Sequence, residues 1–461
     1  MTTDREPGSY KDPKGYIYYK KNSNSIFRRI TKFGSKSFLE LEKSGIYKKA
    51  ASKKFLIGYK KKLQSKNGEI ELEHPKIPYL SYSHEWTFSQ LKKTALFHLD
   101  FHLFLLKNGY TLSDANTHNV QFIGNKPIFI DILSIIPFKK GSLWDGYQQF
   151  CESFLFPLII CSLKKIPINK ISQGYLNGIP LEDTYSFLST MQKLKFFNFL
   201  HITLPAIINK KIDSKKINSK IKDTKGLTKE KLTLLITQIK NHIEKLKDPF
   251  SNIDSVWNEY ESNNFYGEGD VSKKEKIIGQ VIKKNKPKML FDLGCNAGNF
   301  SKVSLQSGAE YVVGFDFDIG ALSKAFERSV KKNLNFLPLY FDATLPSTNS
   351  GWFESERMGF MSRSKDCDFV LALALEHHLI ISKNIPIDSF VDWLTNISHN
   401  GIVEFVPKND QAVKELLRNR EDIFYNYSIE TFESILSKKV KIVKKHIISQ
   451  SGRVLFEFSK K

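Results

Sequence analysis

Residues 288–316 read KMLFDLGCNAGNFSKVSLQSGAEYVVGFD and carry the strongest fold signal in the chain. A short apolar run ends in Asp292, a turn with Gly294 and Gly298 follows, and a helix-like segment comes next. A second apolar run then ends in Asp316. The pattern predicts a strand, a tight turn, a helix and a second strand, with a carboxylate at the tip of each strand.

This layout favours a nucleoside ligand. The two glycines allow a sharp turn and a close approach of the backbone to a ligand, and Asp316, about 20 residues past the turn, can accept hydrogen bonds from ribose hydroxyls. A dinucleotide site would need G-x-G-x-x-G, but Cys295 and Asn296 stand where its next glycine belongs. A carboxylate at Asp292 would also repel a pyrophosphate. The residues therefore favour S-adenosylmethionine, which has a ribose and cationic groups but no phosphate, over a dinucleotide or a turn without a ligand.

From these residues onward the sequence resembles class I S-adenosylmethionine-dependent methyltransferases. Residues 288–316 resemble the first two motifs, and residues 337–342 (LPLYFD), 368–378 (DFVLALALEHH) and 401–407 (GIVEFVP) resemble the third, fourth and fifth strands. The resemblance implies a Rossmann-like α/β domain with a seven-stranded mixed sheet. Asp342 would face the adenine. The residues that it implies for cofactor binding are Asp292, Gly294, Cys295, Asn296, Gly298, Asn299, Phe300, Asp316, Phe317, Asp342 and Ala343.

The loop after the predicted fourth strand holds the candidate catalytic residues Glu376, His377 and His378. Methylation of a hydroxyl is helped by a base, and a histidine titrates near neutral pH. We expect His378 to be the base and His377 to be the second choice, with Glu376 as a catalytic or structural partner; packing of one histidine against the sheet is the alternative. The loop has no N-P-P-[YF] motif and no cysteine, which argues against methylation of an amide, adenine N6 or cytosine C5.

Acceptor binding is predicted for Trp352 and Arg357, which lie in a long connection between the third and fourth strands. A connection of this length is usually functional or disordered, and a plain surface excursion is the alternative. Glu404 lies within an otherwise apolar strand, and a buried carboxylate needs a partner. We expect it to face the acceptor pocket or to pair with Arg357 or Arg420.

The net charge of +22 is unevenly distributed. Residues 1–250 hold 42 Lys and Arg against 21 Asp and Glu, whereas residues 251–461 hold 28 against 27. A site for RNA would therefore lie in the first half, but no RNA-binding motif occurs there, and a lysine-rich composition explains the same excess. The spacing of the four cysteines predicts neither a metal site nor disulfides, and the polar start and the short apolar runs predict a cytoplasmic protein with no membrane span.

Local signals in the first half predict one long helix and one hairpin. Apolar residues recur at helical spacing over residues 85–107, and Asn108 and Gly109 would end that helix. Two short strands are predicted on either side of Gly124 and Asn125.

Asp114 and Asn119 precede this hairpin, and Asp131 follows it. Their spacing resembles the catalytic loop and metal aspartate of protein kinases, in which the first Asp orients the acceptor hydroxyl and the other two residues hold magnesium. However, Leu112 and Ile132 replace the kinase histidine and glycine, and no phosphate loop is apparent. The sequence therefore favours a kinase-like scaffold over a working kinase, and turn residues that brace a hairpin are the alternative.

Three segments are predicted. Residues 1–207 form an α+β domain of kinase-like type, residues 208–250 a lysine-rich linker and helix, and residues 251–461 the methyltransferase domain. The resemblance implies a segment that closes over the cofactor, and this segment contains Trp257, Tyr260 and Tyr266.

The motifs EWTFSQL (85–91), GWFESER (351–357) and EFVPKND (404–410) extend the resemblance to most of the chain. They resemble a bacterial family of two-part methyltransferase-like proteins, some of which are called nodulation-related. We therefore predict an S-adenosylmethionine-dependent methyltransferase that acts on a hydroxyl of a small molecule or glycan. The alternatives are an RNA methyltransferase, a bifunctional protein with a phosphotransferase domain, and a non-catalytic sensor of S-adenosylmethionine. The oligomeric state stays open.

Overall fold

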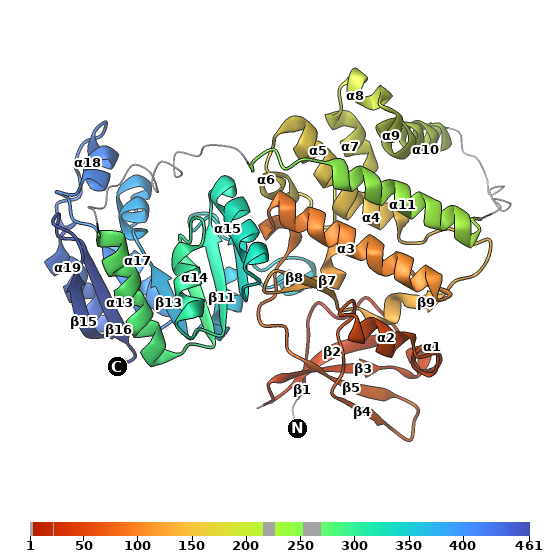
Figure 1. The fold of residues 1–461 in the computed structure, drawn as a ribbon, viewed down its shortest axis with the longest axis horizontal. Coiled ribbons are helices and arrows are strands. Elements are labelled where there is room, and N and C mark those ends of the chain that lie inside the picture. The colour runs from red at the N-terminus through yellow and green to blue at the C-terminus, as the bar shows by residue number, and fades with distance from the viewer. Residues whose placement is uncertain (1–2, 22, 215–225, 252–268) are drawn as a thin grey trace. The chain divides into compact units, whose positions relative to one another are not determined.

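The computed structural model describes residues 3–21, 23–214, 226–251 and 269–461. Trp257, Tyr260 and Tyr266 lie outside these residues. The chain forms two compact units (Figure 1). The N-terminal unit comprises Met1–Ile77, Ser81–Gln121 and Pro127–Pro249, and the C-terminal unit comprises Pro78–Leu80, Phe122–Lys126 and Phe250–Lys461.

A five-stranded antiparallel sheet opens the N-terminal unit, in the order β1-β2-β3-β5-β4. Its strands are β1 (Thr3–Arg5), β2 (Gly15–Lys20), β3 (Ser25–Ile30), β4 (Lys61–Gln64) and β5 (Ile70–Pro75), and its helices are α1 (Lys32–Lys43) and α2 (Ile46–Ser52). Burial alternates along β5, so that Ile70 and Leu72 point to the same face. They share one hydrophobic core with Phe38 and Leu41 of α1 and Tyr47 of α2, which joins the two helices to the sheet.

The rest of the N-terminal unit is mainly helical. Helix α3 (Phe88–Lys107) begins at Thr87, whose hydroxyl accepts a hydrogen bond from the backbone N–H of Gln90 at 3.2 Å, and it ends before Gly109, whose φ is +82°. The predicted long helix is thereby confirmed. Helix α11 (Lys229–Lys245) packs along α3. The other helices are α4 (Tyr147–Phe150), α5 (Phe156–Lys164), α6 (Ile168–Ser172), α7 (Leu181–Phe187), α8 (Thr190–Leu194), α9 (Phe196–Asn198) and α10 (Leu204–Ser214), with short turns η1 (Ser83–Glu85), η2 (Thr117–Asn119), η3 (Ile132–Ser134), η4 (Cys151–Leu155) and η5 (Phe199–Thr203).

Four short strands follow α3 as two antiparallel pairs, β6 with β9 and β7 with β8. They are β6 (Tyr110–Leu112), β7 (Val120–Ile123), β8 (Lys126–Phe129) and β9 (Ile135–Pro137). The β7–β8 hairpin turns at Gly124, whose φ is +60°, as the Gly-Asn pair predicts. The N–H of Ser113 donates to the carbonyl of Ser134 at 2.9 Å, and the N–H of Ile130 donates to that of Asn119 at 2.8 Å. These bonds hold the loop before β7 against the loop after β8.

The C-terminal unit is built on a seven-stranded mixed sheet in the order β12-β11-β10-β13-β14-β16-β15. The strands are β10 (Met289–Leu293), β11 (Tyr311–Asp316), β12 (Phe336–Tyr340), β13 (Phe369–Ala372), β14 (Gly401–Phe405), β15 (Lys441–Ile447) and β16 (Val454–Ser459). The first five strands in this order are parallel, and β16 is antiparallel to both β14 and β15. This is the sheet that the methyltransferase resemblance implies, and the predicted fold class is confirmed.

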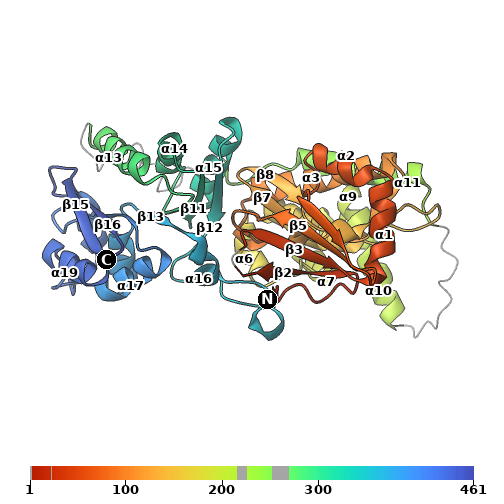
Figure 2. The same cartoon turned by 90° about the horizontal axis from the view of Figure 1, so that it is seen from below.

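Helices cover both faces of this sheet. Figure 2 shows α13, α14 and α15 on one side and α16, α17 and α19 on the other, which explains why every residue of β10 is buried. The helices are α13 (Asp270–Asn285), α14 (Asn299–Gln306), α15 (Ile319–Lys331), α16 (Phe360–Arg363), α17 (Ile387–Ile397), α18 (Gln411–Leu417) and α19 (Ile429–Lys439), with short turns η6 (Trp352–Glu354), η7 (Ser364–Asp366) and η8 (His378–Ser382). The carboxyl ends of the parallel strands share one edge, where ligands of such sheets bind. Among the described residues, no helix is long and apolar enough to cross a membrane.

Candidate active site

The turn after β10 has a backbone that needs glycine. Gly294 and Gly298 have φ angles of +77° and +76°, which L side chains rarely adopt. A Cβ added to Gly298 would lie 2.5 Å from a ring carbon of Phe336, so a larger residue does not fit there. A Cβ added to Gly294 would lie 3.6 Å from Leu375, an ordinary van der Waals contact, so the turn packs against the loop after β13 without a clash. Asn296, between the glycines, also has a positive φ of +47°, a strain typical of ligand sites.

Two carboxylates lie beside this turn. Asp316 accepts hydrogen bonds from the backbone N–H groups of Asn296 at 2.8 Å and Asp318 at 2.9 Å. The buried Asp292 accepts one from the Ser301 hydroxyl at 2.6 Å. Burial raises the pKa of each carboxyl to about 6 against the effect of these hydrogen bonds, and the charge of Asp316 adds to the rise at Asp292. A cation placed beside the turn would stabilise both ionised carboxylates.

The chemistry of this pair fits S-adenosylmethionine. Each carboxylate oxygen has two lone pairs, so Asp316 keeps acceptor capacity for ribose hydroxyls beside its backbone hydrogen bonds. The amino group and sulfonium of the cofactor carry positive charge, which offsets the cost of burying two carboxylates, whereas a pyrophosphate would add to that cost.

Three further residues of the predicted cofactor set surround the turn. The buried thiol of Cys295 packs so closely on Gly314 that a Cβ added there would lie 2.8 Å from the sulfur. Burial raises the pKa of this thiol well above its usual range, which makes Cys295 a packing residue and not a nucleophile. The Asn299 amide donates to Glu275 of α13 at 2.6 Å. Phe300, one residue into α14, is half-buried.

The remaining predicted cofactor residues follow β11 and β12. Phe317 is exposed directly after β11. Asp342 accepts hydrogen bonds from the backbone N–H of Thr344 at 2.8 Å and from its hydroxyl at 2.7 Å, and this turn also contains Ala343. All of these residues lie at the carboxyl edge of the sheet, as adenosine contacts at this site require.

The loop after β13 is tied to the end of β14. Ala374 has a φ of +50°, which strains a residue with a side chain. The fully buried carboxyl of Glu376 accepts hydrogen bonds from the backbone N–H of Val406 at 2.6 Å and from the hydroxyl of Tyr427 at 3.0 Å. Burial raises the pKa of Glu376 to about 8. Glu376 is therefore enclosed and mostly protonated at neutral pH, and its contacts fix the loop.

The two histidines of this loop differ in their access to solvent. His377 is fully buried, with Nδ1 3.4 Å from Glu376, and burial lowers its pKa to about 3. His378 is only partly buried and begins η8; burial, and then the neighbouring His377, lower its pKa well below 6.5. Both imidazoles are therefore neutral at physiological pH. Of the three predicted catalytic residues, only His378 keeps a surface that an acceptor could reach.

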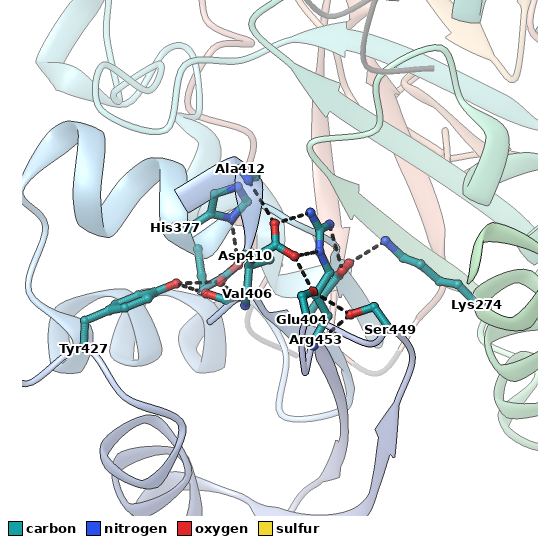
Figure 3. A network of polar contacts seen from close by, with 11 residues as sticks. Lys274, His377, Glu404, Val406, Asp410, Ala412, Tyr427, Ser449 and Arg453 are labelled. Carbon is teal, nitrogen blue, oxygen red and sulfur yellow. Dashed lines mark hydrogen bonds and ion pairs between the residues drawn. The ribbon is translucent and has the colours of Figure 1, made fainter. Parts of the chain in front are cut away.

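A buried network of four charged residues joins α13 and β14 to the residues just before α18 and β16 (Figure 3). Lys274 of α13 donates to Glu404 of β14, and Nη1 of Arg453 lies 3.5 Å from the other Glu404 oxygen. Arg453 also donates to both oxygens of Asp410, at 2.7 and 2.8 Å, and Asp410 caps α18 by accepting from the N–H of Ala412 at 3.0 Å. Two positive and two negative charges balance, as burial of ions requires.

Sequence reasoning missed Lys274, Asp410 and Arg453. For Glu404 it offered a place facing the acceptor pocket or a pair with Arg357 or Arg420, and the structure pairs Glu404 with Lys274 and Arg453. The only signal was the carboxylate in an apolar strand. Arg420 donates to the carbonyl of Ile381 and to the side-chain oxygen of Asn384, and not to Glu404. Arg357 is buried beside Glu356, 4.0 Å away. Glu404 therefore has its ion-pair partners inside the network.

The connection before β13 forms a closed loop that presents two aromatic rings. Ser350 and Arg357 exchange two backbone hydrogen bonds of 3.0 Å, which closes the loop. Trp352 and Phe353 lie exposed between them, and Phe353 has a strained φ of +55°. Arg357 thus anchors the base of this loop, and Trp352 is at its tip.

A shallow pocket lies at the end of β14, next to the residues that hold Glu376. Its lining includes Phe405, Pro407, Lys408, Tyr427 and Ser451. An aromatic and apolar surface with a few polar groups suits a small organic ligand.

The predicted kinase-like residues lie close together in the N-terminal unit. Arg28 of β3 has Nη1 3.5 Å from the carboxylate of Asp131 and donates through Nη2 to the carbonyl of Ile130 at 2.9 Å. Burial raises the pKa of Asp131; the positive charge of Arg28 opposes this rise and the charge of Asp114 adds to it. The amide nitrogen of Asn119 is buried and has no hydrogen-bond partner among the described residues.

Comparison with known proteins gives one relative that matches nearly the whole chain. The chain is 40% identical over 463 residues to nodulation protein NoeA of Rhizobium meliloti (strain 1021). The aligned region covers 99% of this chain and 96% of the relative. No family model matches the chain.

Many solved structures resemble parts of the chain, two methyltransferases among them. Magnesium protoporphyrin IX methyltransferase (ChlM) from Synechocystis PCC 6803, with bound SAH, is 17% identical over 41% of this chain and 84% of that one, with a TM-score of 0.29. N-methyltransferase NodS from Bradyrhizobium japonicum WM9 is 13% identical over 42% of this chain and 97% of that one, with a TM-score of 0.30. The methyltransferase fold is assigned from the strand order and directions and not from these likenesses. The C-terminal unit has the fold of class I S-adenosylmethionine-dependent methyltransferases, and the chain belongs to the family of nodulation protein NoeA.

Proposed function

We propose that the chain transfers a methyl group from S-adenosylmethionine to a hydroxyl of a small molecule or glycan. The observation that carries this proposal is the pair of buried carboxylates, Asp292 and Asp316, beside the glycine turn of a methyltransferase-type sheet. When bound, S-adenosylmethionine supplies a methyl group on a positively charged sulfur atom. Asp316 accepts hydrogen bonds from the ribose, and Asp292 attracts the cationic part of the cofactor.

His378 accepts the proton of the acceptor hydroxyl. Its neutral imidazole has a lone pair available at physiological pH. Because its low pKa makes it a weak base, proton transfer accompanies methyl transfer and does not precede it. Glu376 is a positioning residue, because its hydrogen bonds to Val406 and Tyr427 fix the loop that carries His378.

The acceptor is a compound used in nodulation. This part of the proposal extends the name of the relative, a nodulation protein, to the chain. The exposed rings of Trp352 and Phe353 suit contact with the apolar face of a sugar ring. A glycan acceptor would need no large positive surface, in keeping with the near-neutral charge of residues 251–461.

Separate measurements of binding and turnover test this proposal. Asp316→Asn is expected to weaken binding of S-adenosylmethionine at least about tenfold, since it removes a charge and a ribose acceptor. His378→Ala is expected to lower turnover about 10²-fold with cofactor affinity unchanged. Glu310→Gln, an exposed substitution just before β11, is the control. Unchanged affinity in a folded Asp316→Asn variant would contradict the site.

A phosphotransferase site in the N-terminal unit is the second candidate. It is favoured by the position of Arg28 on β3 beside Asp131, since protein kinases carry their nucleotide-binding lysine on this strand. The unpartnered amide of Asn119 would serve as a magnesium ligand. Magnesium-dependent ATP binding would support this function if Asp131→Ala abolishes it. Asp145→Ala, an exposed control, should leave the binding intact. No binding at about millimolar ATP would exclude it.

RNA as the acceptor is favoured only by the charge of residues 1–250, with 42 basic against 21 acidic residues. It predicts RNA binding whose affinity falls steeply with salt. Binding that does not depend on salt, or no binding, would argue against RNA.

A further inference from the structure

The helices α8 to α10 of the N-terminal unit carry an exposed apolar surface. Met191 and Leu194 of α8 are 77% and 65% exposed, and Phe196 at the start of α9 is 83% exposed. Leu200, Leu204 and Ile208 continue the surface at steps of four residues, which places them along one side of the helical segment. We call these six residues the α8–α10 patch. A contiguous apolar surface on a folded domain usually marks an interaction site.

The α8–α10 patch is held in a defined shape. The amide of Asn198 donates to the carbonyl of Gln192 at 3.0 Å, and the hydroxyl of Thr203 donates to that of Lys193 at 2.9 Å. The opposite side of the segment is buried, with Ile202 and Ala206 inside the unit. Figure 1 shows these helices at the end of the N-terminal unit opposite its five-stranded sheet. The patch is therefore preformed and does not depend on folding of the segment upon binding.

Lysines lie within and beside the patch, and the nearby carboxylate of Glu182 accepts a hydrogen bond from the Asn209 amide at 3.1 Å. Residues 187–210 contain Lys193, Lys195 and Lys210 and no Asp or Glu. Lys195 is exposed between Leu194 and Phe196, in the middle of the patch. A helix with apolar residues, aromatic rings and lysines together is typical of segments that lie in the interface of a membrane. The excess of 42 basic over 21 acidic residues in residues 1–250 acts in the same direction.

We propose that the α8–α10 patch binds the surface of an anionic lipid membrane, with the six apolar side chains inserted among the lipids and the lysines near the headgroups. A second copy of the chain, with the same apolar patch, is the alternative partner. In a twofold dimer through this patch, however, the exposed Lys195 of both copies would be brought into the same apolar interface. Anionic headgroups instead complement them.

Vesicle flotation with the full chain tests the proposal. The chain is expected to float with phosphatidylcholine vesicles that contain about 30 mol % phosphatidylglycerol, and at least about tenfold less with phosphatidylcholine alone or at high salt. The triple variant Met191→Gln/Leu194→Gln/Phe196→Gln is expected to reduce the bound fraction on anionic vesicles at least about tenfold. Lys195→Glu/Lys210→Glu is expected to reduce it as well.

The control is Phe33→Gln, since Phe33 of α1 is 72% exposed, is similar in size and exposure to Phe196, and lies outside the patch. It should leave flotation unchanged, and circular dichroism should show all variants folded. Equal flotation of the triple variant and the unaltered chain would overturn the proposal, as would no flotation of the unaltered chain. A dimer that the triple variant dissociates, without any vesicle binding, would assign the patch to a second copy and overturn it too.

Discussion

Lowering the pH from 7 to 5 is expected to weaken the binding of S-adenosylmethionine by about a hundredfold. The prediction follows from Asp292 and Asp316, which must be ionised to attract the cationic cofactor and to accept hydrogen bonds from its ribose. Burial raises the pKa of each carboxyl from 3.8 to about 6. Within this pH range both acids therefore lose their charge, whereas ordinary surface carboxylates keep most of theirs.

The magnitude follows from the two pKa values. At pH 7 about nine-tenths of each carboxyl is ionised, and at pH 5 about one-tenth is. If only the doubly ionised site binds, the affinity falls about tenfold for each carboxyl, or about hundredfold together, which is ~2.7 kcal/mol of binding free energy. The free energy of unfolding of the free protein changes in the opposite direction. Because ionisation of these buried acids destabilises the fold, their contribution to stability decreases as the pH rises from about 4 to about 6.

Isothermal titration calorimetry between pH 5 and 7 at constant ionic strength measures this dependence. Asp316→Asn should bind more weakly at pH 7 and should show only about a tenfold change with pH, because one titrating carboxylate remains. The exposed control Glu310→Gln should retain the full hundredfold change. A dissociation constant that stays within about threefold from pH 5 to pH 7 in the unaltered protein would refute the role of the carboxylate pair.

Three further predictions concern single side chains. Gly298→Ala should lower the free energy of unfolding of its unit by about 2–5 kcal/mol in urea titration, because the added Cβ strains φ and clashes with the ring of Phe336 in β12. Gly45→Ala, at the same φ of +76° but with no atom within 4 Å, should cost only about 1–2 kcal/mol. Equal losses in the two variants would contradict the packing argument. Glu404→Gln should lower the free energy of unfolding by about 3–5 kcal/mol, because the buried Lys274 and Arg453 lose a counter-charge. Glu433→Gln, at a surface ion pair, should cost less than ~1 kcal/mol. A small effect of both substitutions would show that the network contributes little to stability. His378→Ala should lower turnover but not binding in a methyl-transfer assay, and unaltered turnover would remove its role as the base.

The cofactor side of the site could be predicted because its signals are local. The acids and glycines of residues 288–316 lie within a single strand–turn–helix–strand unit, and β10, α14 and β11 form where the pattern places them. The same holds for α3, whose ends are marked by Thr87 and Gly109, and for the hairpin at Gly124. Hydrophobic spacing, caps and turn residues act over a few residues, so a sequence displays them directly.

The buried network could not be predicted because its members are distant in sequence. Lys274 lies 130 residues from Glu404, and Arg453 lies 43 residues from Asp410. Each of these lysine, arginine and aspartate residues looks like an ordinary surface residue, since nothing near it in sequence indicates burial. Only the crossing of α13 over the sheet and the antiparallel return of β16 bring the four charges together.

In the loop after β13, contacts with distant residues also decide what the sequence does not display. The sequence indicated Glu376, His377 and His378 as a catalytic group with His378 as the preferred base, but it could not show which of these side chains is enclosed. The π-helical turn that begins at His378 and the contacts of Glu376 with Tyr427, 51 residues away, decide which side chain is enclosed. Exposure of the α8–α10 patch was also hidden, because its apolar residues at helical spacing are typical of a core.

Transfer of a labelled methyl group would show whether the protein methylates an acceptor, and which one. The protein is incubated with methyl-labelled S-adenosylmethionine and an extract of its source, and nucleic acid, protein and small-molecule or glycan fractions are then separated. We expect label in the nuclease-resistant glycan or small-molecule fraction, and much less of it with Asp316→Asn at a cofactor concentration below the dissociation constant of the unaltered protein. No label in any fraction despite cofactor binding would contradict the assignment as a methyltransferase, and label released by nuclease would contradict the proposed acceptor in favour of RNA.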